Sequence, residues 1–425
     1  MKRIYRLIAL LGIAALLLGG CGEKKPEPAG KLWENAPTLT YGVMETEKLT
    51  VLPWDSGRAE FTSDYALAET ETGYYAATML NVLYYADKAA ADNWLPVCNE
   101  PDCDHSRNVD CNAKTSHFFL IKDGRIYFEV SHIAGSLESG TKAGKVLYSM
   151  APDGSDRKIA YTLEDAMVAG GEGSINTLLT PQHWLYAVQE MQTDGSFKVR
   201  FFRVTENGAT EYPVNSKDPQ SQQLAWLMSI RPNVYGDSYF MAPMGEDGAA
   251  IACIFEGEEL KTLDLSSVII GPYLGGYISG DTLRYFRQND GYYDHNILSG
   301  EEVKLTDARL ENSGAYMVLP NCILETTIYS GWEKNELLAE HQMELFDGER
   351  WCSVTLPREL KFPTKGVDLS VLGVTSDSIL LYRTEIVMEQ VGNDIRPFMD
   401  TVVYQIQIGA EQPSLEYYAT IRQPR

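Results

Sequence analysis

The chain has 425 residues, with 36 Lys and Arg against 59 Asp and Glu, which gives a formal net charge of -23. Such an acidic surface repels phosphate backbones and anionic lipid, so we expect no nucleic-acid partner. Seven cysteines are too few for a disulfide-stapled scaffold of this length, and the chain is long enough to bury a large core.

Residues 1–20 have the composition of a lipoprotein signal peptide. A basic start is followed by an apolar run from Leu7 to Leu18 and then by Leu18-Gly19-Gly20-Cys21. The apolar run is shorter than the roughly 18 to 20 residues that span a bilayer, so it predicts a removed signal and not a membrane helix. We expect Cys21 to carry a diacylglyceryl anchor with acyl chains such as palmitate, and the protein to lie on the outer face of the cytoplasmic membrane. An ordinary secretory signal is the alternative.

Residues 21–48 are rich in Pro, Gly and charged side chains and hold little that could be buried. This composition predicts a flexible tether. The remainder, residues 49–425, is expected to form one all-β domain.

A unit of about fifty residues recurs from Tyr65 onward, at a period typical of propeller blades. Its first marker is a short turn followed by an apolar strand that carries Tyr, Phe or Trp, as at 123–128, 182–186, 236–240, 280–286 and 377–382. Its second marker is a strand, a glycine turn and a further strand, which is the pattern of a β-hairpin. Pro152-Asp153-Gly154 and Asp347-Gly348 are two such turns.

Counting a degenerate first copy, the pattern predicts a single β-propeller of about seven four-stranded blades. No segment after Tyr65 has a sustained helical period, which disfavours α/β folds and bundles. A pair of β-sandwiches is the alternative, although sandwich strands do not normally repeat in one fixed order.

Residues 147–159, LYSMAPDGSDRKI, combine the aromatic strand, the hairpin turn and a polar last strand. They resemble the TolB-like class of extracytoplasmic β-propellers. The chain as a whole, with a cysteine motif after the first unit, resembles a group of uncharacterised propeller lipoproteins from Gram-positive anaerobes. The resemblance covers nearly all of the mature chain with short motifs. It implies a fold and a location, and adds little about chemistry.

The two faces of the predicted propeller differ in loop length. Turns on one face are short, whereas long segments are expected on the other, including 131–145, 330–340 with Trp332, 385–400, 99–116 and 215–231. Long loops on a rigid scaffold concentrate function, so this loop-rich face is the predicted binding surface and Trp332 a candidate ligand contact. Unselected surface insertions are the alternative.

Cys98, Cys103, His105 and Cys111 lie within one short inter-unit loop. Three thiols and an imidazole match the ligand count and chemistry of a closed tetrahedral zinc site, and Pro101 keeps the loop from becoming helical. The spacing matches no standard zinc finger, however. A disulfide between two of the cysteines, or three free thiols, remains open. Four protein ligands leave no open position for metal catalysis.

No GxSxG, HExxH, P-loop or repeated Asp-box motif is present. The six histidines are expected to be solvated or satisfied locally. Cys253, Cys322 and Cys352 lie singly within apolar strand patterns and are expected to be buried free thiols that behave as small hydrophobic residues. The sequence therefore favours a monomeric, non-catalytic binding propeller, membrane-anchored through its N-terminal lipid, that recognises a peptide, glycan or protein partner. The alternative is an extracytoplasmic hydrolase or lyase that acts on glycans with carboxylates near the central channel.

Overall fold

The computed structural model describes residues 66–424 except 79–80, 102, 104, 106–110, 116–118, 123, 133–143, 163–173, 180–183, 192–196, 206–207, 213–232, 236–237, 242–248, 257–258, 270–275, 280–281, 288–289, 297, 311–314, 320–321, 328–340, 362–368 and 393. The predicted signal peptide, the tether and the first residues of the 49–425 domain lie outside the described residues. In the part of the chain that is described, no helix is long and apolar enough to cross a membrane.

The described chain is nearly all β-strand and forms seven four-stranded antiparallel sheets, each from strands that are consecutive in the sequence. The first four sheets comprise β1 (Ala66–Glu69), β2 (Gly73–Ala77), β3 (Leu83–Asp87) and β4 (Leu95–Pro96); β5 (Phe119–Lys122), β6 (Arg125–His132), β7 (Gly144–Met150) and β8 (Lys158–Thr162); β9 (Ser174–Leu179), β10 (Trp184–Met191), β11 (Phe197–Thr205) and β12 (Gly208–Tyr212); and β13 (Asn233–Tyr235), β14 (Ser238–Met241), β15 (Ala249–Glu256) and β16 (Glu259–Ile269). The last three comprise β17 (Gly276–Ser279), β18 (Thr282–Arg287), β19 (Gly291–Asn296) and β20 (Glu302–Asp307); β21 (Ala315–Val318), β22 (Ile323–Thr326), β23 (Met343–Phe346) and β24 (Trp351–Ser353); and β25 (Ser370–Val374), β26 (Ser378–Val391), β27 (Asp394–Gln407) and β28 (Leu415–Pro424).

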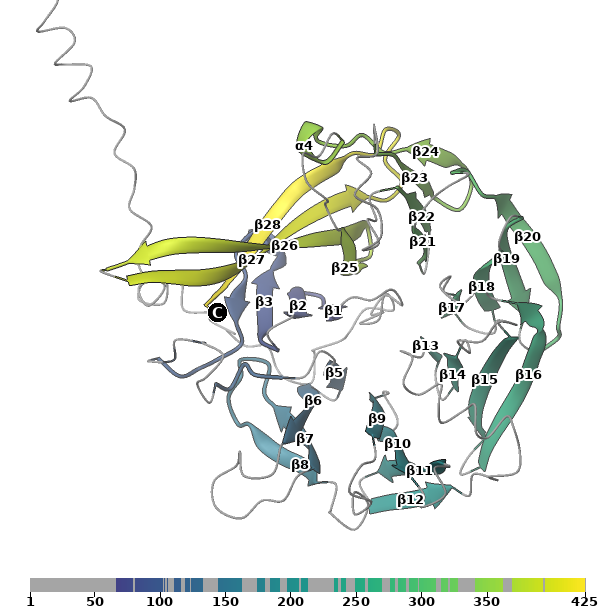
Figure 1. The fold of residues 1–425 in the computed structure, drawn as a ribbon, viewed down its shortest axis with the longest axis horizontal. Coiled ribbons are helices and arrows are strands. Elements are labelled where there is room, and N and C mark those ends of the chain that lie inside the picture. Colours follow the sequence, from purple (N-terminus) through teal and green to yellow (C-terminus); the bar gives the residue numbers. More distant parts are fainter. Residues whose placement is uncertain are drawn as a thin grey trace, which may run out of the picture.

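The only helical pieces among the described residues are η2 (Lys88–Ala90) and α4 (Arg358–Lys361). Figure 1 shows the sheets arranged around a common centre, with the first and last sheets next to each other. The architecture is therefore propeller-like, as the sequence repeat predicts.

Glycine turns fix the hairpins at the predicted places. Gly154 between β7 and β8 has φ 80°, and Gly348 between β23 and β24 has φ 102°. These are left-handed conformations that glycine adopts without a Cβ clash. The predicted hairpins at Asp153-Gly154 and Asp347-Gly348 are confirmed.

One predicted loop is instead a hairpin. The segment 385–400 was expected to belong to the long loops, but β26 runs to Val391, and β27 resumes at Asp394 in register with it. The charged residues Glu385, Glu389, Asp394, Arg396 and Asp400 all fall on one face of the paired strands and none on the other, a period-two pattern that favours strand over loop.

The core lies between neighbouring sheets. Aromatic and aliphatic side chains of the first sheet, such as Tyr75 and Leu83, pack against Phe128 and Met150 of the second. Another cluster joins the first sheet to the last, and its members include Leu67 and Tyr84 of the first sheet and Tyr382 and Val403 of the last. We call this second group the closure cluster.

Among the described residues, no strand is shared between the first and last sheets, and the contacts between them are made by side chains and by close backbone approach. A Cβ on Gly373 of β25 would lie 2.5 Å from the Cβ of Leu67 in β1, which shows how tightly the two strands pack. At the outer side, the Gln423 side-chain amide donates to the Thr78 hydroxyl at 2.5 Å, and the Tyr84 hydroxyl donates to the Arg422 carbonyl at 3.4 Å.

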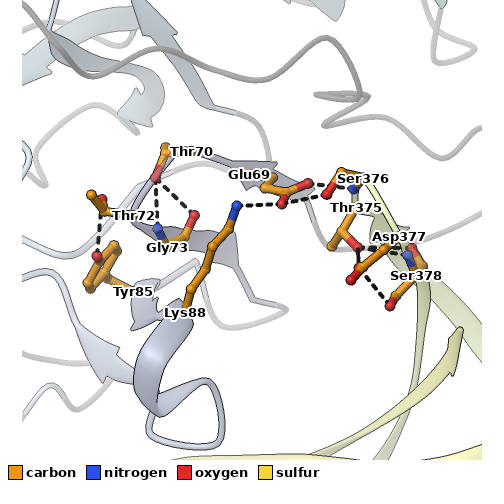
Figure 2. A network of polar contacts seen from close by, with 10 residues as sticks. All are labelled: Glu69, Thr70, Thr72, Gly73, Tyr85, Lys88, Thr375, Ser376, Asp377 and Ser378. Carbon is orange, nitrogen blue, oxygen red and sulfur yellow. Dashed lines mark hydrogen bonds and ion pairs between the residues drawn. The ribbon is translucent and has the colours of Figure 1, made fainter.

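Glu69 forms the main polar connection across this junction (Figure 2). Its buried carboxylate accepts from the Ser376 backbone N–H at 2.6 Å and from the Ser376 hydroxyl at 3.1 Å. Lys88, which follows β3, provides the countercharge at 2.7 Å. A buried carboxylate needs such partners, since a charge without them is strongly disfavoured.

Glu69→Ala should lower the free energy of unfolding by about 2 kcal/mol, because it leaves the Ser376 donors without their acceptor. Chemical denaturation followed by tyrosine and tryptophan fluorescence measures this. Glu71→Ala, at an exposed neighbouring position, is the matched control and should be near neutral. Equal effects of the two substitutions would contradict a role for Glu69 in closure.

Candidate functional site

The four residues of the predicted metal site come together at the junction of the first two sheets. The chain leaves β4, turns as the Cys98 N–H donates to the Pro96 carbonyl, and turns again as the Cys103 N–H donates to the Glu100 carbonyl. His105 has φ 53°, a left-handed conformation uncommon for a residue with a Cβ. These turns fold a short loop back on itself and aim its side chains at one point.

One ligand atom from each of Cys98, Cys103, His105 and Cys111 lies within 4.8 Å of all the others. His105 and Cys111 are buried, and Cys98 and Cys103 are half-buried. A tetrahedral zinc ion with bonds near 2.3 Å holds its sulfur ligands about 3.8 Å apart, so the cluster has the size of a single metal site. The predicted set of four residues is thus brought together, and it could hold a metal ion.

The three thiols influence one another strongly. A hydrogen bond from Cys111 lowers the pKa of the Cys98 thiol to about 3, and His105 contributes to the same shift. The neighbouring Cys98 sulfur, together with burial, raises the pKa of Cys111, and burial raises that of Cys103. Three thiolates so close together would repel one another, and a bound cation would offset that repulsion.

The β7–β8 hairpin supports the loop from the second sheet. Arg157 donates from Nη1 to the Cys111 carbonyl at 2.8 Å, and its guanidinium lies over the Tyr148 ring at 4.6 Å. Gly154 packs so closely that a Cβ there would lie 2.4 Å from the Val97 carbonyl oxygen. The sequence predicts this hairpin but not its contact with the loop, because the two segments are separated by more than forty residues and no short-range pattern links them.

Behind the site, the loop joins the first sheet. The Leu83 N–H donates to the Ala113 carbonyl at 2.8 Å, and Val82 forms a bridge with Lys114. Cys111 and Ala113 also belong to the closure cluster. The loop therefore contacts the first and second sheets and contributes to the closure cluster.

The two other predicted site residues, Cys21 and Trp332, lie outside the described residues, as do His117 and His183. His341 is buried, and burial lowers its pKa, while Nδ1 of His295 is 3.7 Å from Glu302. Cys322 is a buried free thiol in the core between the last two sheets, as expected.

The segment 385–400, predicted as a long loop of the binding face, forms instead the end of the β26–β27 hairpin, which projects from the ring (Figure 1) and carries a second candidate surface. Directly opposed residues in an antiparallel pair share a face. One face of the hairpin is formed by uncharged side chains, and we call it the hairpin face: Thr384, Ile386, Met388, Gln390, Ile395, Pro397, Met399 and Thr401. Its outer aliphatic side chains are solvent-exposed, with Ile386 at 57%, Met388 at 60% and Ile395 at 70%.

No family model and no curated protein matches the chain. Among solved structures it is similar to a prolyl endopeptidase, with 10% identity and a TM-score of 0.41 over 88% of this chain and 56% of that one. A puromycin-hydrolyzing peptidase from Mycobacterium tuberculosis has 11% identity and a TM-score of 0.38, over 82% of this chain and 52% of that one. The chain thus spans about half the length of these peptidases, and at these values the similarity transfers no activity to it.

Gly154→Ala should lower the free energy of unfolding by about 2 kcal/mol more than Gly300→Ala, because only the former adds a steric clash, with the segment before Cys98. Both glycines have similar φ values, 80° and 73°, so the conformational cost is matched, and nothing lies within 4 Å of a Cβ at Gly300. Thermal unfolding of both variants gives the comparison. Similar losses would show that the hairpin does not pack on the loop as described.

Proposed function

We propose that the protein is a lipid-anchored, extracytoplasmic binding protein whose domain is a closed, seven-bladed propeller of the TolB-like class. The lipoprotein signal motif Leu18-Gly19-Gly20-Cys21 supports the lipid anchor, and the seven consecutive four-stranded sheets support the propeller. On this proposal the protein acts on the outer face of the cytoplasmic membrane by binding and not by catalysis.

The hairpin face is the observation that carries the binding role. Three large aliphatic side chains are exposed together on a projecting hairpin, whereas other exposed aliphatics among the described residues, such as Ile159 and Leu298, lie on separate elements. Single exposed apolar residues are ordinary, but a grouped set on a projecting element is typical of a protein-binding surface. The partner class that fits an uncharged, aliphatic face best is a protein, ahead of a glycan.

We further propose that the Cys98–Cys111 loop is a structural zinc site. Three thiolates and one neutral imidazole form a closed ligand set for a borderline-soft cation, with no position left for a substrate. The ion would bind Cys98, Cys103, His105 and Cys111 and hold the loop against the first two sheets. It would take no part in chemistry.

The purified protein should contain roughly one equivalent of zinc, with sulfur–zinc distances of about 2.3 Å by X-ray absorption. Cys111→Ser should lose the metal, because it removes a buried ligand. Cys352→Ser changes a half-buried free cysteine in β24 and should retain it. Metal-free protein from a reducing, zinc-replete preparation, or a disulfide found among the three cysteines by mass spectrometry, would refute the zinc site.

Cys21→Ala should move the protein from the membrane fraction to the soluble fraction, because the acyl chains are the proposed membrane contact. Fractionation with immunodetection measures the distribution, and Cys352→Ser again serves as the control. An unmodified residue at the mature N-terminus, detected by mass spectrometry, would contradict the anchor.

The binding role is tested in intact cells with a photo-reactive amino acid placed at Met388 or, as the matched control, at Ile159, which is 58% exposed on β8. We expect a cross-linked adduct of a discrete protein at Met388 and none at Ile159. Equal labelling at both positions, or none at Met388, would argue against the hairpin face as a binding surface.

A further inference from the structure

The β26–β27 hairpin separates its side chains by charge. Every charged residue of the projecting segment lies on the side opposite the hairpin face: Arg383, Glu385, Glu389, Asp394, Arg396 and Asp400. Several of these charges are paired within the sheet. Arg383 contacts Glu385 at 2.8 Å, and Arg422 of β28 pairs with both Asp400 and Glu389. The hairpin face therefore offers a partner no charge to recognise.

The root of the hairpin face is already an interface. Tyr382 and Val403 are directly opposed, they belong to the same side of the strands as Ile386, and they pack in the closure cluster against the first sheet. Further out, the same side of the strands continues past the first sheet and becomes exposed. The hairpin face is thus the outward continuation of an inter-sheet contact.

We propose that the occupant of the hairpin face is the hairpin face of a second copy of this chain, related by a two-fold axis. The inference rests on the proposed protein-binding function and names its partner. A two-fold contact brings a patch against itself, which suits a patch that is aliphatic and uncharged. It replaces the monomer expected from the sequence.

The electrostatics favour this occupant over a charged one. A nucleic acid or an anionic membrane would meet a chain with a net charge of -23, and a basic peptide would find no carboxylate on the hairpin face. A second copy supplies a face of the same length, without charge, on an element that projects far enough to be reached. The two acidic bodies still repel each other, so the dimer should tighten as salt screens that repulsion.

The size of the hairpin face sets the expected affinity of the dimer. Two faces of this size bury on the order of 1,000 Å² in total, the lower end of specific protein interfaces. We therefore expect dissociation in the micromolar range, with monomer and dimer in exchange.

Sedimentation velocity over a concentration series tests the proposal on the protein carrying Cys21→Ala, so that no acyl chain contributes to association. We expect the mass to approach that of a dimer at high micromolar concentration, and the dimer to be stronger at high salt. Met388→Lys should weaken dimerisation by at least about tenfold, because two lysines would meet near the axis. Ile159→Lys, the matched exposed aliphatic position on β8, should leave it unchanged, and thermal unfolding verifies that both variants are folded.

A monomer at every concentration and salt condition would overturn the second-copy proposal, as would a dimer that Met388→Lys leaves intact. The cellular cross-link separates this failure from failure of the binding role. An adduct at Met388 with a different protein keeps the binding role and refutes the second copy, whereas no adduct refutes the binding role itself.

Discussion

The whole fold depends on closure between sheets that are far apart in the sequence. Glu69 and Ser376 are separated by 307 positions, and Thr78 and Gln423 by 345. Bringing the ends of such a long segment together costs entropy, and in the part of the chain that the structure describes every sheet consists of its own consecutive strands. The apolar closure cluster and a buried, fully partnered carboxylate provide the compensating contact. The packing at this junction is tight, because a Cβ on Gly373 would lie 2.5 Å from the Cβ of Leu67.

The Cys98–Cys111 loop provides further contacts between sheets, at the junction of the first and second sheets. Its backbone bonds to the start of β3, its carbonyl at Cys111 receives Arg157 from the second sheet, and its buried sulfur lies in the closure cluster. The first sheet has the shortest outer strand, β4, with two residues. The loop follows this short strand directly and bonds back to the first sheet, where the Leu83 N–H donates to the Ala113 carbonyl.

Sequence patterns predict local features of this protein better than distant ones. Glycine turns, aromatic strands and the four clustered ligand residues are each encoded within a few neighbouring positions, and the structure contains them. The contacts of Glu69 with Ser376 and of Gly154 with Val97 join segments that no spacing relates, so only the folded chain reveals them. The segment 385–400 was wrongly predicted to be a loop for a different reason. Its strands are 14 residues long, more than twice the usual length, and strands of ordinary length would have ended before this segment.

The closure cluster also explains why the hairpin can serve as a binding element. A projecting two-stranded hairpin is marginal by itself, but the root of this one is fixed between β25 and β28 and buried against the first sheet. Its aliphatic face is therefore presented in a fixed orientation, which reduces the conformational entropy lost when a partner binds. The contacts that close the ring and hold the cysteine loop thus also preorganise the hairpin face, so binding there depends on the integrity of the same junction.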